Sequence, residues 1–596
     1  MVYRTCSCGS LRLKHIGFES ILCGWVDSRR DHGGIIFVDL RDEDGKTQIV
    51  FLQEGNDVTL ARLAHSLRSE DVIQVKGKVA ARLPGTENEE LTTGAIEVIA
   101  SSLKIFSRAN VLPFPLDSEI SNEDLRLTYR YLDLRRPDMV RNLRLRHRLA
   151  QSTRLYMDTQ GFLEVETPIL TKSTPEGARE FLVPSRLHPG HFYALTQSPQ
   201  QYKQLLMMGC IEKYFQIAKC FRDEDGRADR IMELTQIDIE ASFVSHEDIF
   251  ALIEGLMRRI FRDTIGVQIA IQFPHLTYQQ AMDRFGSDRP DTRFGMELVD
   301  ISDIFHLSNV GIFRAVLDSG GCVKAINVKN GIARISTGQI ERLTKIAHHH
   351  GAKGLAFIKV ENGKWKSPIV KFFSPLEKDA ITDRLHIEEE DLILLGADKW
   401  QTACEVLGRI RLYLAEYLKI VTDTNRWDFL WIVDFPLLKF DETERRWMTV
   451  HHPFTRPKEE DFPLLEAGEF SQVRAEAYDL VLNGTEIGGG SLRIYESDLQ
   501  ARIFNVLGID PEKQDLLFGH LLRAFQFGAP PHGGIALGVD RLAMLLCKSP
   551  HLRDVVAFPK NSHGQDPLFS SPSTVENHQL KELSIQLTDL PPPGRL

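Results

Sequence analysis

Two charged segments, far apart in the chain, could together bind an anionic ligand. In the first, an apolar run ends in a loop that contains Arg222 and Glu224, and the chain returns through residues 233–240. In the second, a glycine-rich run at residues 533–538 leads to Arg541. Glycines allow a backbone or a ligand to approach closely, and Arg541 at the start of the next helix is a fixed cation. Each segment alone is a weak signal, because such short patterns occur by chance.

The elements around the first segment predict a sheet with at least one long helix. A helical pattern at residues 138–160 is followed by residues 161–168, which begin with glycine, continue as a strand and end at proline. A helix and strand of this kind commonly serve packing or dimerisation. Further strand-like runs follow at residues 192–195, 213–221 and 233–243.

Residues 1–107 predict a separate five-stranded barrel with one helix at residues 58–67. Its expected strands span residues 21–26, 34–40, 46–52, 72–81 and 97–105. This is the inventory of an OB barrel, whose open face binds single-stranded nucleic acid. Arg29, Phe37 and Gln48 lie on the strands that would form this face, although alternation places some of these residues inside the barrel.

Composition indicates a multidomain globular protein of a reducing compartment. At 596 residues the chain exceeds what one hydrophobic core usually holds. No apolar run approaches the roughly 18 residues of a membrane span, and the first residues lack the order of a secretory signal. The eight cysteines are scattered along the chain, which favours reduced thiols and a cytoplasmic location.

The net charge of −10 argues against general affinity for nucleic acids, but it does not exclude a local basic surface. One short stretch is rich in arginine: Arg126, Arg130, Arg135, Arg136, Arg141, Arg144, Arg146 and Arg148. This stretch could contact a polyanion. The alternative is a solvated helix face whose arginines have acidic partners elsewhere.

Three segments of the chain resemble motifs 1, 2 and 3 of the class II aminoacyl-tRNA synthetases: residues 161–168, residues 220–240 and residues 533–542. Further short sequence motifs are similar to those of the bacterial-type aspartyl-tRNA synthetases of this class. They include Thr174-Pro175-Glu176-Gly177, Gln197-Ser198-Pro199-Gln200, His451-His452-Pro453-Phe454 and Gly488-Gly489-Gly490-Ser491-Leu492-Arg493. The resemblance runs from about residue 4 to residue 590.

The resemblance implies an α+β multidomain fold. An OB-fold anticodon-binding domain would be followed by a class II catalytic domain built on an antiparallel sheet, with an inserted α+β domain. The expected parts are residues 1–107 for the OB domain, 108–140 for a hinge, 141–289 and 425–560 for the two halves of the catalytic domain, 290–424 for the insertion and 561–596 for a C-terminal extension. A homodimer is implied as well.

The implied reaction is the activation of L-aspartate by ATP, with Mg²⁺, and transfer of the aspartyl group to the 3′ end of tRNA-Asp. Arg222 and Arg541 would be catalytic. The resemblance assigns ATP binding to Arg222, Asp223, Glu224, Ile231, Leu234, Glu486, Gly538, Val539, Asp540 and Arg541. It assigns aspartate binding to Glu176, Gln200, Lys203, Arg222, Asp238, His451, His452 and Arg493. It assigns Mg²⁺ to Glu486 and Asp479, because hard cations prefer carboxylate oxygens.

The prediction that the substrate is aspartate depends on Lys203 and Arg493. A substrate carboxylate enclosed in a pocket requires fixed cations, since burying it unpaired costs several kcal/mol. Asp238 is expected to hold both cations in place. A lysyl-tRNA synthetase would instead line its pocket with acids. A second alternative, an asparaginyl-tRNA synthetase, shares the layout, and a third is a non-catalytic RNA-binding paralogue that would be expected to lack Arg222 or Arg541.

Two features depart from the strict aspartate pattern. Leu234 stands where the family has a phenylalanine that stacks under adenine, and Ile231 replaces a glutamine that contacts ATP. These changes predict weaker binding of ATP. The alternative is that the site has lost its activity. In the OB-like domain, His32 and Gly85 resemble the non-discriminating enzymes, which accept both tRNA-Asp and tRNA-Asn. The resemblance adds Arg29, Phe37 and Gln48 to the expected anticodon contacts, with Phe37 stacking on a splayed base.

Overall fold

The computed structural model describes residues 2–52, 58–118, 120, 122–173, 179–226 and 230–588. The chain divides into two compact units. The first comprises Met1–Arg141 with Asp566–Phe569, and the second comprises Asn142–Gln565 with Ser570–Leu596. In the described part of the chain, no helix has the length and the apolar content needed to cross a lipid bilayer.

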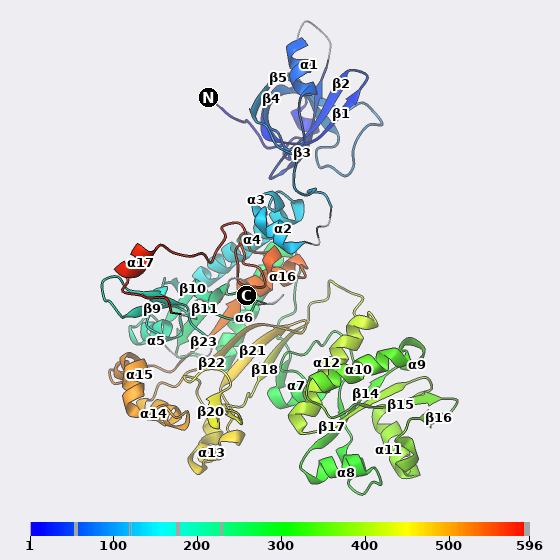
Figure 1. Cartoon of the computed structure of the whole chain (residues 1–596), viewed down its shortest axis with the longest axis vertical. Helices are drawn as coiled ribbons and strands as arrows, with labels where there is room; N and C mark the ends of the chain where they lie inside the picture. The colour runs from blue at the N-terminus through cyan, green and yellow to red at the C-terminus, as the bar shows by residue number, and fades with distance from the viewer. Residues whose placement is uncertain are drawn as a thin grey trace. The chain divides into compact units, whose positions relative to one another are not determined.

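The N-terminal unit contains a closed five-stranded barrel with strand order β1-β2-β3-β5-β4, drawn in blue in Figure 1. Its strands are β1 (Glu19–His32), β2 (Ile35–Asp42), β3 (Gly45–Phe51), β4 (Val72–Ala81) and β5 (Ile96–Ser107), and its helix is α1 (Val58–His65). Alternate residues of the strands, such as Leu22, Val38 and Val75, fill the interior. The predicted OB barrel is confirmed.

Strand β1 continues six residues beyond the end that the sequence predicted. After a bulge between Val26 and Ser28 it continues to His32, paired with β2. Polar and charged residues dominate this second half, so the hydrophobic pattern of the sequence gave no sign of it. The pairing with β2 supplies the missing backbone partners.

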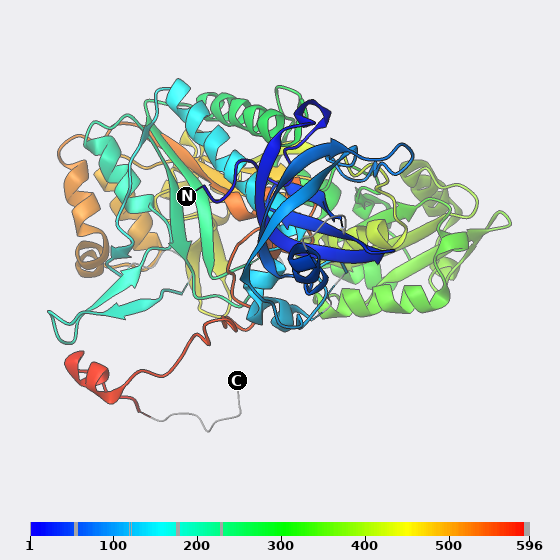
Figure 2. The same cartoon turned by 90° about the horizontal axis from the view of Figure 1, so that it is seen from above.

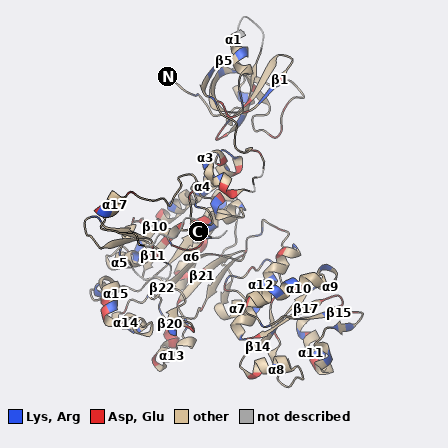
Figure 3. Cartoon of the chain, viewed as in Figure 1, with Lys and Arg blue, Asp and Glu red and all other residues tan. Residues whose placement is uncertain are grey.

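Helices α2 (Glu123–Thr128), α3 (Arg130–Asp133) and α4 (Pro137–Thr159) follow the barrel. Most of the arginine-rich stretch at their surface is engaged within the protein. Arg126 and Arg130 pair with Asp133, and Arg135 pairs with Glu70 of the barrel. Acidic and basic residues are interspersed over the ribbon (Figure 3). These ion pairs favour the structural interpretation of the stretch.

The second unit is built on an eight-stranded sheet with the order β12-β18-β21-β22-β23-β11-β10-β6. Its strands are β6 (Leu163–Glu164), β10 (Lys213–Phe221), β11 (Glu233–Ser242), β12 (His275–Thr277), β18 (Phe429–Val433), β21 (Ala477–Leu482), β22 (Thr485–Leu492) and β23 (His532–Gly538). The pairs β12/β18 and β10/β6 are parallel and the other pairs are antiparallel. Two runs of the chain about 150 residues apart thus form one sheet.

Helices α4, α6 (His246–Ile265) and α16 (Val539–Cys547) cover one face of this sheet (Figure 2). Leu149, Ile253 and Leu542 from these helices share one core cluster with Ile237 and Trp431 of the sheet. The opposite face of its central strands is left for polar residues. This face carries the site described below.

Smaller elements surround the sheet. They are β7 (Leu170–Thr171), β8 (Leu182–Pro184), β9 (Phe192–Leu195), β19 (Leu438–Asp441), β20 (Arg446–Thr449), α5 (Gln200–Met208), α7 (Tyr278–Phe285), α13 (Phe462–Ala467), α14 (Ser497–Val506), α15 (Pro511–Phe525) and α17 (Asn577–Glu582). Helix α5 carries Gln200 and Lys203 at its start. Helix α7 leads into the segment predicted to be an insertion.

That segment folds as a five-stranded sheet with the order β13-β14-β17-β15-β16 and helices on both faces, in light green in Figure 1. Its strands are β13 (Val299–Asp300), β14 (Cys322–Val328), β15 (Ala356–Glu361), β16 (Lys364–Lys366) and β17 (Leu392–Asp398). Its helices are α8 (Gly311–Asp318), α9 (Gly331–Arg334), α10 (Thr337–His349), α11 (Pro375–Leu385) and α12 (Trp400–Tyr417). The insertion is therefore an α+β layer structure, as predicted.

Candidate active site

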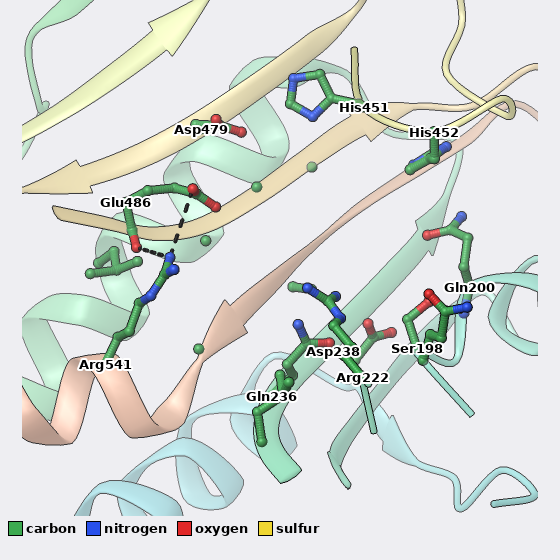
Figure 4. A pocket seen from close by; sticks show the side chains of 18 of the residues that line it. Ser198, Gln200, Arg222, Gln236, Asp238, His451, His452, Asp479, Glu486 and Arg541 are labelled. Atoms are coloured by element: carbon green, nitrogen blue, oxygen red, sulfur yellow. Dashed lines mark hydrogen bonds and ion pairs between the residues drawn. The ribbon is translucent and has the colours of Figure 1, made fainter. Parts of the chain in front are cut away.

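A cavity of about 590 Å³ opens on the polar face of the central strands. The two charged segments of the sequence meet in it. Arg222 directly follows β10, and Arg541 lies in the first turn of α16 after β23. Figure 4 shows Arg541 and Glu486 at one end of the cavity and Asp238, Arg222 and Gln200 at the other. The sheet therefore brings together cations that lie more than 300 residues apart.

Four buried charged side chains lie at the end of the cavity that contains Asp238 and Arg222. Lys203 Nζ lies 3.1 Å from Asp238 Oδ1 and 3.2 Å from Glu240 Oε2. Arg493 donates two hydrogen bonds to Glu240, from Nε at 2.9 Å and from Nη2 at 3.0 Å. All four side chains are at most 2% exposed. This arrangement holds two cations in place inside the protein, where an isolated charge is costly.

The structure differs from the sequence prediction in which carboxylate holds Arg493. Asp238 pairs with Lys203, whereas Glu240 holds Arg493 and also contacts Lys203. Glu240 lies two residues after Asp238 on β11, so both side chains point to the same face of the sheet. This spacing of two was the signal in the sequence that could have identified Glu240.

The two carboxylates differ in their electrostatics. Burial alone would raise the pKa of Glu240, but the guanidinium of Arg493 and the ammonium of Lys203 outweigh it and lower this pKa to about 2. Burial also raises the pKa of Asp238, and Lys203 offsets only part of that effect. Glu240 is therefore the firmly ionised partner of the pair.

Two neutral histidines complete this end of the cavity. Burial, and secondly the charge of Arg493, lower the pKa of His451 to about 4 and the pKa of His452 well below its ordinary value. Arg493 Nη1 donates to His452 Nε2 at 2.6 Å, so this nitrogen carries no proton. The other ring nitrogen, Nδ1, lies 3.3 Å from Thr455 Oγ1 and accepts from the backbone nitrogen of Phe454 at 3.3 Å.

Arg222 differs from the other cations of the cavity. Among the side chains that the structure describes, none forms an ion pair or a hydrogen bond with its guanidinium, whereas Lys203 and Arg493 each contact buried carboxylates of the protein. A guanidinium presents five donors in a planar fork that matches carboxylate and phosphate groups. Arg222 is thus available to an anionic ligand.

The opposite end of the cavity combines one cation with carboxylates. Arg541 Nη1 donates to the backbone oxygen of Glu486 at 2.9 Å and lies 3.7 Å from Glu486 Oε2. Burial, and secondly the negative charge of Glu486, raise the pKa of Asp479 well above its usual range. Gly489 lies opposite Asp479 in the sheet, and a Cβ at Gly489 would lie 2.6 Å from Asp479 Oδ1. Glycine is required there to leave room for this carboxylate.

Asp479 and Glu486 are chemically suited to Mg²⁺. Within the described residues, no group of three or more His, Cys, Asp or Glu side chains is placed to hold a metal ion by protein ligands alone. This fits Mg²⁺, which usually keeps several waters and is bound through one or two carboxylates together with substrate phosphates. A cation would also relieve the charge that raises the pKa of Asp479.

The remaining residues of the predicted ATP set divide into two groups. Those that line the cavity with Arg222 and Arg541 are Glu224, Ile231, Leu234, Glu486, Gly538 and Asp540. Asp223 and Val539 do not: Asp223 pairs with Arg179 at 3.4 Å, and Val539 is buried in the core. Asp540 has a structural task, since its carboxylate accepts hydrogen bonds from Arg146 at 2.5 Å and from the backbone of Thr235 at 2.7 Å.

The predicted aspartate set lines the cavity with one exception. Its lining members are Gln200, Lys203, Arg222, Asp238, His451, His452 and Arg493. Glu176 lies outside the described residues. The cavity is also lined by four residues that were not predicted as site residues: Gln197, Ser198, Gln236 and Asp288. The first two lie in the family-like stretch just before α5, but a polar residue in a loop gives no further sign of its role.

The expected anticodon residues lie in the other unit. Phe37 and Gln48 are on neighbouring strands of the barrel, and the rings of Phe37 and His32 meet edge to face at 6.1 Å. His32 is the last residue of β1, beside a turn of Gly33 and Gly34 that both have positive φ. These residues share one outer face, and Gln48 donates to Glu97 at 2.8 Å.

Arg29 is separated from that face. It pairs directly with Val38, whose side chain is buried inside the barrel, and residues opposite each other in a sheet share a face. Arg29 is nevertheless exposed. Gly85, with φ of 84°, lies in an exposed turn of the same unit.

Comparison with known families covers most of the chain. Residues 122–562 match the model of the tRNA synthetases class II (D, K and N), and residues 21–106 match the model of an OB-fold nucleic acid binding domain. The first match spans the charged cavity, and the second spans the barrel.

Two relatives are similar over nearly their whole length, and each is named an aspartate–tRNA(Asp/Asn) ligase. The protein from Methylacidiphilum infernorum is 53% identical over 98% of this chain and 97% of its own. The protein from Opitutus terrae is 52% identical over 98% of this chain and 99% of its own.

Solved structures share the fold at lower identity. Asparaginyl-tRNA synthetase from Pyrococcus horikoshii, complexed with asparaginyl-adenylate, aligns with a TM-score of 0.59 at 19% identity and covers 94% of this chain and 98% of its own. A putative aspartyl-tRNA synthetase from Leishmania major aligns with a TM-score of 0.57 at 18% identity, over 94% of each chain.

Proposed function

The chain belongs to the class II tRNA synthetases (D, K and N), and we propose that it is an aspartate–tRNA ligase that charges both tRNA-Asp and tRNA-Asn. The observation that carries this proposal is the pair of buried cations, Lys203 and Arg493, beside Arg222, which pairs with no side chain of the described residues. A pocket of this charge fits an amino acid with an anionic side chain. It does not fit lysine.

In the first step, the α-carboxylate of aspartate attacks the α-phosphate of ATP, forms the mixed anhydride aspartyl-adenylate and releases pyrophosphate. Such a displacement depends on positioning and on compensation of negative charge more than on a protein base. We assign to Arg222 the contact that bridges the two reacting anions. Lys203 and Arg493 hold the side-chain carboxylate, and Gln200 lies near the ammonium group.

At the other end of the cavity, Arg541 binds the terminal phosphate of ATP, and Glu486 with Asp479 hold Mg²⁺. The ion supplies charge compensation to the triphosphate when it is bound. Glu224 is kept near the adenine side by Arg230, at 3.1 Å. In the second step a hydroxyl of the terminal adenosine of tRNA attacks the anhydride carbonyl, and AMP leaves.

Pyrophosphate exchange tests this function directly. The purified protein is incubated with ATP, Mg²⁺ and labelled pyrophosphate, and aspartate, asparagine or lysine is added in separate reactions. We expect exchange with aspartate alone. Exchange that prefers asparagine or lysine would support one of the related synthetases, and no exchange with any of them would support a non-catalytic RNA-binding paralogue.

The leucine at position 234 is expected to weaken ATP binding. Leu234 lines the cavity on β11 and gives apolar cover without ring stacking. Stacking of an aromatic ring on a base is worth about 1–3 kcal/mol. The variant Leu234→Phe should therefore lower KM for ATP by about fivefold or more, with KM for aspartate unchanged. An equal KM for ATP in both proteins would refute this assignment.

Choice of tRNA is expected to depend on His32. The imidazole lies next to Phe37 at the rim of the barrel face, where it can contact a splayed base. Charging of purified tRNA-Asp and tRNA-Asn with labelled aspartate should proceed at comparable rates. His32→Leu should lower charging of tRNA-Asn relative to tRNA-Asp by about tenfold, the effect of one base contact. A hundredfold preference of the unchanged protein for tRNA-Asp would end this proposal.

We further propose a homodimer that works in the cytoplasm, where ATP and tRNA occur and where its eight free cysteines stay reduced. Leu163 of the edge strand β6 is 53% exposed, and Leu170, Leu182 and Phe192 are exposed nearby in sequence. Exposed apolar residues at a sheet edge mark an interaction surface. Sedimentation should give twice the chain mass of 67.8 kDa. Leu163→Glu should shift the protein toward monomer, whereas Leu516→Glu, on helix α15, should not.

A further inference from the structure

The loop between α7 and β13 connects the catalytic sheet to the insertion, and it also reaches the cavity. Asp288 of this loop lines the cavity together with Asp479 and Glu486 and is exposed at its rim. A third carboxylate at the end that receives a triphosphate would repel the substrate unless a cation lay between them. A cation at this end would make the charge of Asp288 favourable for binding of the triphosphate.

The insertion fixes this loop through one buried arginine. Arg411 of α12 is 1% exposed, and its Nη2 donates to the backbone oxygens of Asp291 at 2.9 Å, Phe294 at 2.7 Å and Gly295 at 2.9 Å. Its guanidinium carbon lies 3.9 Å from the centre of the Phe294 ring. One side chain thus binds three carbonyl oxygens of the loop, as a planar fork with five donors can do.

The start of the loop is fixed by direct contact of backbones. Gly286 ends α7 with φ of 63°, and Gly408 of α12 packs against it. A Cβ at Gly408 would lie 2.4 Å from the backbone oxygen of Gly286. Asp288 lies two residues beyond this contact and three residues before the first carbonyl held by Arg411. Its position is therefore set from both sides by helix α12.

We propose that Asp288 is a third carboxylate of the Mg²⁺–triphosphate end of the site, and that the insertion positions it there through Arg411. This inference rests on the proposed ATP-dependent function. Because no three protein ligands converge among the described residues, Asp288 acts through the water shell of the ion. Outer partners of this kind orient the bound water and contribute to metal affinity. Arg411 does not touch the cavity and is a positioning residue.

The test measures cation binding apart from catalysis. Mn²⁺ is titrated into the full-length protein in the presence of ATP, and free Mn²⁺ is followed by electron paramagnetic resonance. Asp288→Asn should raise the Mn²⁺ dissociation constant about three- to tenfold, since the carboxylate is exposed and partly screened. Arg411→Lys, which keeps the charge but loses the fork, should raise it in the same direction. KM for aspartate should not change in Asp288→Asn.

Two matched variants control for general effects of charge. Asp318→Asn removes an exposed carboxylate at the end of α8, and Arg409→Lys alters an exposed arginine on the same helix as Arg411; both should bind Mn²⁺ as the unchanged protein does. An unchanged dissociation constant in Asp288→Asn would overturn the proposal. An effect in Asp288→Asn without one in Arg411→Lys would overturn the positioning by the insertion.

The same titration separates this inference from the proposed function. If the unchanged protein failed to exchange pyrophosphate with any amino acid, the ligase function would be refuted. The binding of Mn²⁺ with ATP would still report on Asp288, because it requires no turnover. Thermal unfolding of Arg411→Lys shows whether the variant is folded, and Asp288→Asn tests the proposal at an exposed position where folding is not at risk.

Discussion

Replacement of Arg222 by lysine should lower the rate of aspartyl-adenylate formation by about 10³-fold, the effect expected when a guanidinium that stabilises a phosphoryl transition state is lost. Lysine keeps the charge but cannot bridge a carboxylate and a phosphate with two parallel donors. Because no described side chain pairs with Arg222, its loss should leave the fold intact. Single-turnover formation of the adenylate measures the effect, and thermal unfolding should show no change.

The matched control for this variant is Arg258→Lys, at an exposed position of α6 in the same unit. It should leave the rate unchanged. If Arg222→Lys formed the adenylate at a rate within a few-fold of the unchanged protein, the contact between Arg222 and the reacting anions would be wrong. The cavity would then need another cation for the α-phosphate.

Replacement of Lys203 by methionine should remove both aspartate activation and part of the stability. Lys203 is 1% exposed and contacts Asp238 and Glu240. Without it, the substrate carboxylate loses a cation, and kcat/KM for aspartate should fall by about 10³-fold or more. The free energy of unfolding should fall by about 3–5 kcal/mol, because removing one partner of a buried ion pair leaves a buried carboxylate uncompensated.

A second substitution separates these two effects. In the double variant Lys203→Met with Asp238→Asn, the unpaired carboxylate is also removed. Stability measured by denaturant unfolding should therefore recover in large part, whereas aspartate activation should not. If the double variant regained activation, Lys203 would act only as a structural partner of Asp238, and the assignment of the substrate carboxylate to Lys203 would fail.

The sequence determined the elements and the types of charge. Most strands of the barrel follow from alternation of apolar residues, and the long helices follow from their period and their end signals; both are local properties. The second half of β1 and the glycine-rich strand β22 have no such alternation. The family's sequence motifs were also sufficient to predict an anionic amino acid and ATP as ligands, because they contain Arg222, Lys203, Arg493 and Arg541. Leu234 and Ile231 were identified as departures in the same way.

Only the tertiary structure decided which side chains face each other. Arg493 is held by Glu240, 253 residues away, and not by Asp238 as the sequence suggested. Asp540 accepts hydrogen bonds from Arg146 and from the backbone of Thr235, and Val539 lies in the core. Arg29 lies on another face of the barrel than Phe37. Local pattern fixes the conformation of a segment, but the direction of a side chain toward a partner depends on the register of strands from distant parts of the chain.

The insertion shows this limit most clearly. Its sequence has apolar alternation and few clustered acids, and it carries no chemical signal of its own. Folding brings Arg411 to the backbone of the loop that carries Asp288, more than 100 residues earlier in the chain. An arginine that binds carbonyl oxygens leaves no mark in composition or spacing, because any residue supplies a carbonyl. The sequence therefore determined the chemistry of this protein's cavity, and the packing of distant segments decided which groups hold that chemistry in place.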